Sequence, residues 1–399
     1  MNIKMSRPAG SGFAGKKIIL LAGLVLLTAA SCNQTAMQPV PAGQQPDPVQ
    51  PTTASATSPQ SAPPVVKPPV PARPVQVVAT GLNVPWDIVF LPGGDMMVTQ
   101  RTGAIRRIGA HPATITIPSV AHVGEGGLMG MVLHPQFEQN SLIYLFYTTT
   151  GKTNQIVRFK LNGDKLTEDK VIIGNIASSI YHDGGRMAFG PDGMLYITTG
   201  DAQNPNSAQD LNSLNGKILR LTADGAIPAN NPFGTAVWSY GHRNPQGIVW
   251  DDRGRMWETE HGPSATWPNC CQDELNLIEK GKNYGWPNSV GDNVAAGTVG
   301  PIKHSGRSIW APGGIVYVNH SLFFGGLKGS ALYEAKLGSD GKIAAFVGHL
   351  KGTYGRLRAV VLGPDGYLYI TTSNRDGRGT VRSGDDKIIK VKPDALSSL

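Results

Sequence analysis

The chain has 399 residues, of which 50 are Gly and 30 are Pro while only 16% are charged, and this composition favours a turn-rich all-β protein over a helical one. Its formal net charge is +8, but the first 31 positions hold four of the basic residues and no acidic residue, so the remainder carries a net charge of +4. Because that remainder has no run rich in Lys and Arg, we do not expect it to bind nucleic acid.

Residues 1–31 have the features of an export signal. A basic start is followed by the apolar run from Ile18 to Ala30, which is too short to cross a bilayer comfortably. The run leads to Ala29-Ala30-Ser31-Cys32, which resembles the bacterial lipoprotein box, although Ala29 stands where that box usually has Leu. We therefore expect export to the bacterial cell envelope, either lipid-anchored through Cys32 or periplasmic. The alternative is an ordinary signal peptide with an incidental Cys.

Residues 32–74 are predicted to form a tether. They are rich in Pro, with Gln, Ser, Thr and Ala between the prolines. Such a segment buries too little apolar surface to offset its ordering entropy and behaves as a semi-extended spacer. From residue 75 the composition changes, so residues 75–399 are expected to form the folded domain.

Five segments of the folded domain repeat one pattern, in which an apolar strand, a turn and a second apolar strand follow each other. The segments are 85–99, 128–147, 186–199, 246–258 and 358–372. The third and fifth share Gly-Pro-Asp-Gly-x-Leu-Tyr-Ile-Thr-Thr outright. Asp-Gly and Pro-Asp pairs supply the dihedral angles of tight turns. A weaker sixth unit covers residues 313–336, with Gly325-Gly326 as its expected turn.

Repeats of this size predict a β-propeller or a β-solenoid, and the irregular spacing favours a propeller, whose blades tolerate long loops. We predict six blades. The strand-like stretches 75–78 and 387–391 are expected to close the ring as one blade. The competing fold is a large β-sandwich, which does not require a repeated Pro-Asp-Gly turn.

His182 and Asp201 flank the hairpin of the third repeat, one just before its first strand and one just after its second. A hairpin brings its two ends together, so the two side chains are expected to meet. A carboxylate that fixes the tautomer of a His makes it a suitable general base. The alternative is a loop His that caps a turn.

Three further groups of residues point to ligand binding. Arg243 beside Asn244 suits a polarised carbonyl or a carboxylate, although a loop Arg in a salt bridge is the alternative. Oxygen-rich loops that follow Gly262-Pro263 suit a hard cation such as Ca²⁺, without diagnostic ligand spacing. The cations Lys328, Arg356 and Arg358 form either a site for a polyanionic ligand or a solvated charged face.

Cys270-Cys271 has no other Cys partner if Cys32 is lipidated. A vicinal disulfide is strained across a trans peptide, where adjacent Cα atoms lie only ~3.8 Å apart. Free thiols and an intermolecular bridge are the alternatives.

Six ordered motifs between residues 76 and 392 resemble those of the soluble, pyrroloquinoline-quinone (PQQ)-dependent glucose and aldose sugar dehydrogenases. The motifs are Gly124-Glu125-Gly126-Gly127-Leu128-Met129-Gly130, His182-Asp183-Gly184-Gly185-Arg186, Leu214-Asn215-Gly216-Lys217-Ile218-Leu219-Arg220-Leu221, Gly241-His242-Arg243-Asn244-Pro245-Gln246-Gly247, Glu260-His261-Gly262-Pro263 and Asp273-Glu274-Leu275-Asn276-Leu277-Ile278. The resemblance implies a six-bladed propeller that oxidises the anomeric hydroxyl of aldoses to lactones and passes the electrons to an external acceptor.

The resemblance also implies a role for each candidate residue. His182 matches the base that takes the anomeric proton, and Asp201 matches the carboxylate that orients it. Arg243 and Asn244 match residues at the quinone oxygens, where a fixed cation stabilises developing negative charge. Two sets of cofactor ligands complete the match: the main-chain carbonyls of Gly262 and Pro263 for Ca²⁺, and the side chains of Lys328, Arg356 and Arg358 for the carboxylates of PQQ.

The sequence departs from the family at Glu125, where the glucose dehydrogenases have Gln. A carboxylate beside an anionic cofactor is expected to change cofactor affinity. The segment 264–272 is an apparent insertion, and other loops are shorter than in the glucose dehydrogenases, which favours the aldose-dehydrogenase branch and a monomer or weak dimer. A non-catalytic binding propeller and a metal-dependent lactonase or esterase are the competing functions. No central cluster of acidic metal ligands is evident in the sequence.

Overall fold

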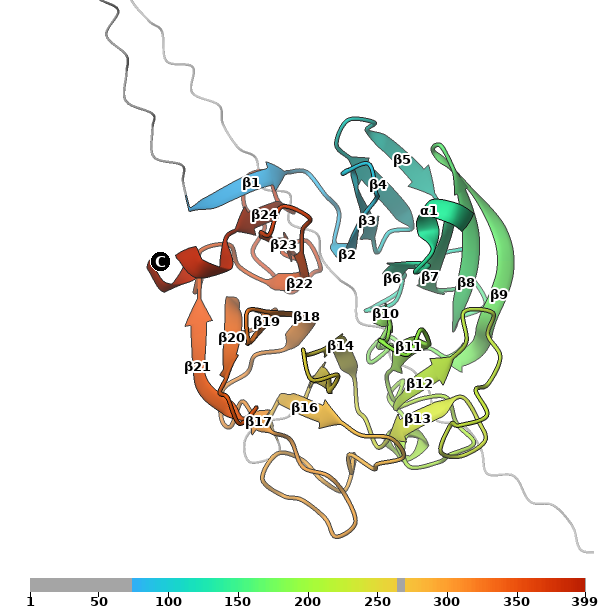
Figure 1. Cartoon of the computed structure of the whole chain (residues 1–399), viewed down its shortest axis with the longest axis vertical. Coiled ribbons are helices and arrows are strands. Elements are labelled where there is room, and N and C mark those ends of the chain that lie inside the picture. Colours follow the sequence, from blue (N-terminus) through green and yellow to red (C-terminus); the bar gives the residue numbers. More distant parts are fainter. Residues whose placement is uncertain (1–73, 264–269, 399) are drawn as a thin grey trace, which may run out of the picture. The chain divides into compact units, whose positions relative to one another are not determined.

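The computed structural model describes residues 74–263 and 270–398. The predicted signal at 1–31, Cys32 and nearly all of the predicted tether lie outside the described residues. Among the described residues, no helix is long and apolar enough to cross a membrane. The described chain forms six four-stranded antiparallel sheets arranged as the blades of a propeller (Figure 1). The predicted six-bladed β-propeller is therefore confirmed.

Each of the first five blades is built from four consecutive strands. The first two blades contain β2 (Pro85–Phe90), β3 (Met96–Gln100), β4 (Ala104–Ile108) and β5 (Ala113–Thr116), then β6 (Leu128–Leu133), β7 (Leu142–Thr148), β8 (Thr153–Asn162) and β9 (Lys165–Ala177). The third and fourth contain β10 (Met187–Phe189), β11 (Leu195–Thr199), β12 (Lys217–Leu221) and β13 (Val237–Tyr240), then β14 (Pro245–Trp250), β15 (Met256–Glu260), β16 (Glu274–Ile278) and β17 (Lys303–His304). The fifth contains β18 (Pro312–Val318), β19 (Ser321–Gly326), β20 (Ala331–Leu337) and β21 (Ile343–His349).

The sixth blade closes the ring, as the sequence predicted. It joins β22 (Leu357–Leu362), β23 (Leu368–Thr372) and β24 (Ile388–Val391) to the first strand of the domain, β1 (Val75–Ala79). Val75 pairs with Val391 and Val77 with Ile389, so both ends of the domain share one sheet. The described helices are short: α1 (Phe137–Asn140), η1 (Pro205–Ala208) and η2 (Pro393–Ser398).

The prediction that Gly325-Gly326 forms the turn of the fifth blade is wrong. Gly325 and Gly326 lie inside β19, and the turn between β18 and β19 is formed by Asn319 and His320, which both have positive φ. Gly325 is required for packing instead, because a Cβ there would overlap the backbone of Leu357 in the next blade. Asn tolerates the left-handed conformation that such a turn needs.

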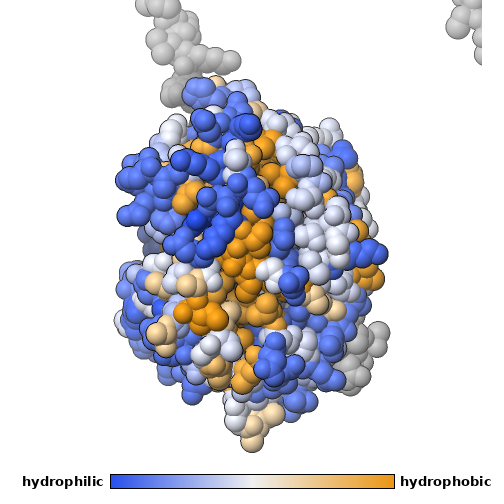
Figure 2. Space-filling view, turned by 90° about the vertical axis from the view of Figure 1, so that its right-hand side faces the viewer, coloured by the Kyte–Doolittle hydropathy of each residue, from blue (hydrophilic) through white to orange (hydrophobic). Residues whose placement is uncertain are grey.

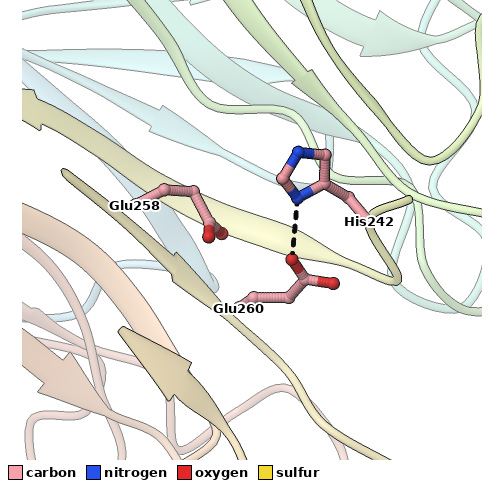
Figure 3. A group of neighbouring side chains, drawn as sticks. All are labelled: His242, Glu258 and Glu260. Carbon is pink, nitrogen blue, oxygen red and sulfur yellow. Dashed lines mark hydrogen bonds and ion pairs between the residues drawn. The ribbon is translucent and has the colours of Figure 1, made fainter. Parts of the chain in front are cut away.

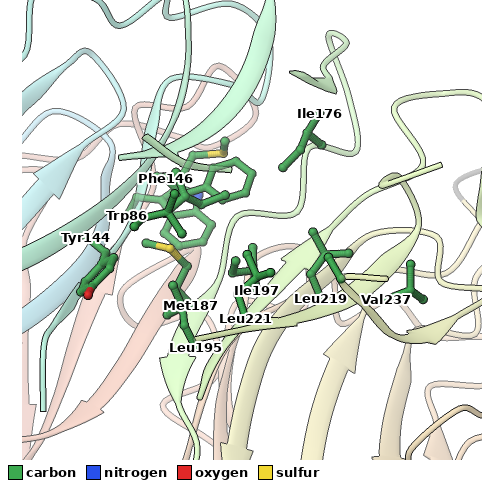
Figure 4. Close-up of a cluster of buried hydrophobic side chains, with 14 residues drawn as sticks. Trp86, Tyr144, Phe146, Ile176, Met187, Leu195, Ile197, Leu219, Leu221 and Val237 are labelled. Atoms are coloured by element: carbon green, nitrogen blue, oxygen red, sulfur yellow. The ribbon is translucent and has the colours of Figure 1, made fainter. Parts of the chain in front are cut away.

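Apolar side chains between neighbouring blades form the core. The described residues contain six buried apolar clusters, and each joins one blade to the next around the ring. The largest packs Phe146 and Met129 of the second blade against Met187, Leu195 and Ile197 of the third (Figure 4). Figure 2 shows the side where β8 and β9 lie, and this face is largely polar with an apolar strip. The inner strands of adjacent blades contact one another around the whole ring, which fixes the loops at their ends.

Candidate active site

A cavity of about 680 Å³ lies at the end of the propeller where the inner strands begin and the second strands end. Its wall contains eight of the ten predicted site residues: Glu125, His182, Arg243, Gly262, Pro263, Lys328, Arg356 and Arg358. The other two, Asp201 and Asn244, are buried behind the wall. The fold therefore brings together residues that are spread over more than 230 positions of the chain.

His182 and Asp201 meet as predicted. The Nδ1 atom of His182 lies 2.7 Å from Oδ1 of the buried Asp201. The second oxygen of Asp201 accepts a hydrogen bond from Nε1 of Trp286 at 2.8 Å, which fixes the carboxylate. Nε2 of His182 has no hydrogen-bond partner among the described residues, although the side chain lines the cavity. A carboxylate on Nδ1 selects the tautomer in which Nε2 is free to accept a proton.

The backbone of His182 adopts a left-handed conformation, with φ at +67°. A residue other than Gly in this region costs of order 1–3 kcal/mol and persists where its surroundings hold it. Here the main-chain N–H donates to Oε2 of Glu125 at 3.0 Å, and the carbonyl oxygen accepts from the N–H of Ala202 at 3.1 Å. Gly200 packs so closely that a Cβ there would overlap the carbonyl oxygen of His182.

Three cationic side chains of the cavity wall have no carboxylate partner among the described residues. Arg358 is buried and has only long contacts, at 3.4 Å to Gln246 and 3.5 Å to Ser373. Burial and the nearby Arg101 lower the pKa of Arg358 to about 9. Arg243 donates to the carbonyl of His261 at 3.1 Å but leaves its buried Nε without a partner. Lys328 has no hydrogen-bond or ion-pair partner in the described chain.

Arg356 differs from these cations because it is already neutralised. It forms an ion pair of 2.8 Å with Asp376. Burial raises the pKa of Asp376, but the positive charges of Arg356 and Arg358 outweigh burial and lower this pKa. Asp376 was not predicted as part of the site. Asn244 is fully buried, where its Oδ1 accepts from the N–H of Gly184 and its Nδ2 has no partner.

Glu125 lies at the mouth of the cavity and is paired with Arg378, a cation that sequence reasoning missed. The Nη1 atom of Arg378 lies 2.6 Å from Oε1 of Glu125, and its guanidinium lies 5.1 Å from the centre of the Tyr181 ring. Burial raises the pKa of Glu125, but the charge interactions with His261 and Arg378 and the hydrogen bond from the N–H of His182 outweigh burial and lower this pKa to about 2. The only sequence signal for Arg378 is its turn, Asp376-Gly377-Arg378, which follows the strand of the fifth repeat.

Gly262 and Pro263, the residues predicted for Ca²⁺, line the cavity. The carbonyls of Gly262 and Pro263 accept no hydrogen bond from the described residues, so both are available to a hard cation. The N–H of Gly262 donates to Asp273 at 2.9 Å, and Asp273 also accepts from the N–H groups of Trp310 and Ala311. Asp273 therefore anchors this loop from behind.

Cys270 and Cys271 form a vicinal disulfide, with their Cα atoms 3.2 Å apart and a cis peptide between them. The sequence argument against such a bond assumed a trans peptide. The backbone of Cys271 packs against Gly262, one of the two residues predicted for Ca²⁺, since a Cβ at Gly262 would overlap the Cys271 carbonyl oxygen.

A buried acidic group that the sequence did not reveal lies within the fourth blade. It consists of His242, Glu258 and Glu260 (Figure 3). Both nitrogens of His242 are used, one 3.0 Å from Glu260 and the other 2.9 Å from the hydroxyl of Ser239. Desolvation raises the pKa of Glu258 well above its usual value. None of the three residues lines the large cavity, so this group does not supply a hydrolytic metal centre there.

Comparisons with known proteins agree with this architecture. The model of the family described as glucose / sorbosone dehydrogenase matches residues 82–382. The aldose sugar dehydrogenase YliI of Escherichia coli is 33% identical over 80% of this chain and 92% of its own length. Quinoprotein glucose dehydrogenase B of Acinetobacter calcoaceticus is 34% identical over 54% of this chain and 52% of its own.

A solved structure shares both the fold and a higher identity. The PQQ-bound aldose sugar dehydrogenase of Streptomyces coelicolor is 39% identical, with a TM-score of 0.73 over 79% of this chain and 97% of its own. The family match covers the first five blades, β22 and β23 of the sixth, and every predicted site residue. The chain therefore belongs to the glucose/sorbosone dehydrogenase family and is a sugar dehydrogenase of the six-bladed propeller type.

Proposed function

We propose that the protein oxidises the anomeric hydroxyl of aldose sugars to lactones, with PQQ and Ca²⁺ in the cavity and an external electron acceptor. One observation carries this proposal: His182, whose ring is paired with the buried Asp201, lines the same cavity as three cations that have no carboxylate partner among the described residues. The relatives named as aldose sugar dehydrogenase and quinoprotein, and the PQQ-bound neighbour, support the choice of substrate and cofactor.

The chemistry of the wall fits the cofactor. PQQ is an anionic tricarboxylate, and Arg243, Lys328 and Arg358 offer it positive charge that no carboxylate of the described chain neutralises. Arg356 adds a guanidinium that Asp376 holds in place. The carbonyls of Gly262 and Pro263, which accept no hydrogen bond from the described residues, fit Ca²⁺, a cation that prefers oxygen ligands. When bound, the quinone supplies the acceptor for the hydride that leaves the sugar.

His182 is proposed as the general base. Its free Nε2 would take the proton from the anomeric hydroxyl, and Asp201 would stabilise the resulting imidazolium through the 2.7 Å contact at Nδ1. Arg243 lies in the same wall, and its fixed charge would stabilise negative charge that develops opposite the base. Asn244 would act from behind the wall, where it binds the N–H of Gly184 and so fixes the segment that follows His182.

The proposed location follows from the sequence outside the described residues. Signal-like residues 1–31, Cys32 and the Pro-rich stretch that follows would tether the propeller to the surface of a membrane in the bacterial envelope. Replacement of Cys32 by Ser should release the protein into the soluble fraction after cell breakage. Retention with the membranes would exclude anchoring through Cys32.

Reconstitution tests the function directly. Apo-protein is mixed with PQQ and Ca²⁺, and reduction of an artificial dye is followed with a panel of aldoses and, as a control, with sugar alcohols that lack an anomeric hydroxyl. We expect dye reduction only with aldoses and only when PQQ and Ca²⁺ are both present. PQQ binding without any turnover would favour a non-catalytic propeller, and hydrolysis of a lactone or ester without PQQ would favour the hydrolase.

A further inference from the structure

We propose that Glu125 and Arg378 act as one positioning device for His182, and that the carboxylate at position 125 is required because Arg378 faces it. This inference rests on the proposed role of His182 as the base. It concerns Glu125, which contacts the main chain of His182, and Arg378, which contacts Glu125 from a different blade, since Glu125 precedes β6 and Arg378 follows β23.

Glu125 is held by a hydrogen-bond donor on each side. Its Oε2 accepts the main-chain N–H of His182 at 3.0 Å, and its Oε1 accepts Nη1 of Arg378 at 2.6 Å. The bond to His182 acts on the residue whose φ is +67°, so it supports a backbone conformation that the residue would otherwise leave. Asp201 fixes the imidazole ring, whereas Glu125 fixes the main chain that carries it.

The chemistry of position 125 explains why Gln does not suit this chain. A Gln side chain has one acceptor oxygen and one donor NH₂ group. If its oxygen accepted the N–H of His182, its NH₂ would face the guanidinium of Arg378, and the reverse orientation would set NH₂ against the main-chain N–H. In either orientation of the amide, the NH₂ group of Gln faces another hydrogen-bond donor. A carboxylate accepts from both and forms charge-assisted hydrogen bonds, which are stronger than neutral ones.

The pairing of Glu125 with Arg378 also bears on the affinity for an anionic cofactor, which Glu125 alone was expected to change. Arg378 neutralises the carboxylate within the cavity mouth, and its guanidinium is further held against the ring of Tyr181. Glu125 and Arg378 together therefore add no net charge to the wall. The departure from the family at position 125 is compensated by a cation on a different blade, which is a coupling that one sequence position alone does not reveal.

A double-mutant cycle tests the proposal on the full chain reconstituted with PQQ and Ca²⁺. E125Q should lower kcat about 10-fold, as expected for the loss of a charge-assisted hydrogen bond at the base, with KM for the sugar changed by less than about 3-fold. R378Q should cost less, because Glu125 still accepts from His182. E125Q/R378Q should recover kcat to within about 3-fold of the wild type, since without the guanidinium the NH₂ group at position 125 no longer faces a donor and the amide oxygen is left for the N–H of His182.

The control is D164N, which removes the remote 3.0 Å pair of Asp164 with Arg107 and should leave kcat unchanged. Equal kcat in E125Q and the wild type, or a double variant as slow as E125Q, would overturn the positioning role. The melting temperatures of the four apo-proteins give a readout that needs no cofactor: E125Q should lower the value and the double variant should restore it. If the wild type does not oxidise sugars, the proposed function fails. If the shift in melting temperature of the double variant equals the sum of the shifts of E125Q and R378Q, the proposed coupling between Glu125 and Arg378 is refuted independently of activity.

Discussion

The third and sixth blades contain the same hairpin sequence, and the structure gives the two hairpins the same construction. Asp192 accepts the hydroxyl of Tyr196 at 2.9 Å, and Asp365 accepts that of Tyr369 at 3.0 Å. Each Asp also pairs with a cation of the third strand of its blade, Arg220 in one and Lys390 in the other. The Gly of each turn has nearly the same φ, +73° and +75°.

The two blades differ at the opposite ends of these strands, which face the cavity. The third blade presents His182 with Asp201, a pair suited to move a proton. The sixth presents Arg358, which has no carboxylate partner among the described residues and is suited to hold an anion, beside Arg356 and Arg378, which are each paired with a carboxylate. The repeated turn thus builds the blade, whereas the residues at the cavity ends of its first two strands determine its chemistry. The comparison predicts that variants at the cavity end separate catalysis from cofactor binding, and that variants at the turn affect neither.

The largest effect is expected at the base of the third blade. His182→Ala should lower kcat about 10²–10⁴-fold, the usual contribution of a general base. Asp201→Asn should give a smaller loss, because the imidazole remains but its tautomer is no longer fixed. Steady-state dye reduction at saturating PQQ and sugar measures both. A kcat within about 3-fold of the wild type for His182→Ala would remove His182 from the mechanism.

The second effect is expected at the sixth blade. Arg358→Met removes a buried guanidinium without a carboxylate partner, so the PQQ concentration for half-maximal activity should rise about 10–100-fold. At saturating PQQ, kcat should stay within a few-fold of the wild type. Lys392→Met, on the outer part of the same blade, is the control and should change neither value. If Arg358→Met lowered kcat and left the PQQ requirement unchanged, the assignment of catalysis to the third blade and of cofactor binding to the sixth would be wrong.

The third prediction compares two buried carboxyls beside these sites. Burial raises the pKa of Asp183 to about 6, and its Oδ2 has no partner, whereas Arg356 and Arg358 outweigh burial and lower the pKa of Asp376. An acid whose pKa is higher in the folded state destabilises the fold once it ionises, so the cost of Asp183 is absent below about pH 4 and complete above about pH 6. Asp376 has the opposite sign, and its contribution is lost on acidification.

Asp183→Asn should therefore raise the free energy of unfolding by about 3 kcal/mol at pH 7.5 and by little at pH 4. Asp376→Asn should lower it at pH 7.5. Urea unfolding of the apo-proteins at several pH values measures both. A gain for Asp183→Asn that does not change with pH would show that ionisation of Asp183 is not the cause.

The smallest effect is expected at the two turns. Gly193 and Gly366 have positive φ, and a Cβ would meet no atom within 4 Å at either, so Ala substitution costs only backbone strain. Each variant should lose about 1 kcal/mol of stability and keep the wild-type kcat and PQQ requirement. Clearly unequal losses would show that the two hairpins are not equivalent despite their shared sequence.

The blades were predictable because their information is local. A turn of Pro-Asp-Gly and the alternation of Leu195, Tyr196 and Ile197 specify a hairpin within one stretch of sequence. The meeting of His182 and Asp201 was predictable for the same reason. Gly325-Gly326 misled because Gly there serves packing against the next blade, and only the assembled ring reveals that contact.

The rest of the site depends on pairings that the turn and strand patterns did not indicate. Arg378 lies 253 positions from Glu125 and contacts it from a different blade. Asp376 neutralises Arg356 across the two ends of the β22–β23 hairpin, where a local search of the kind that paired His182 with Asp201 could have found it. The clustering of His242 with Glu258 and Glu260 likewise joins the loop before β14 to β15. The family resemblance identified residue types at the cavity but did not identify which of the cations were already paired.

The most direct test of the account is to measure PQQ binding to apo-His182→Ala and apo-Arg358→Met by calorimetry in the presence of Ca²⁺, beside the wild type. If the third blade supplies the base and the sixth holds the cofactor, His182→Ala will bind PQQ within about 3-fold of the wild type and Arg358→Met at least about 10-fold more weakly. Equal weakening in both variants, or normal binding by Arg358→Met, would contradict the account.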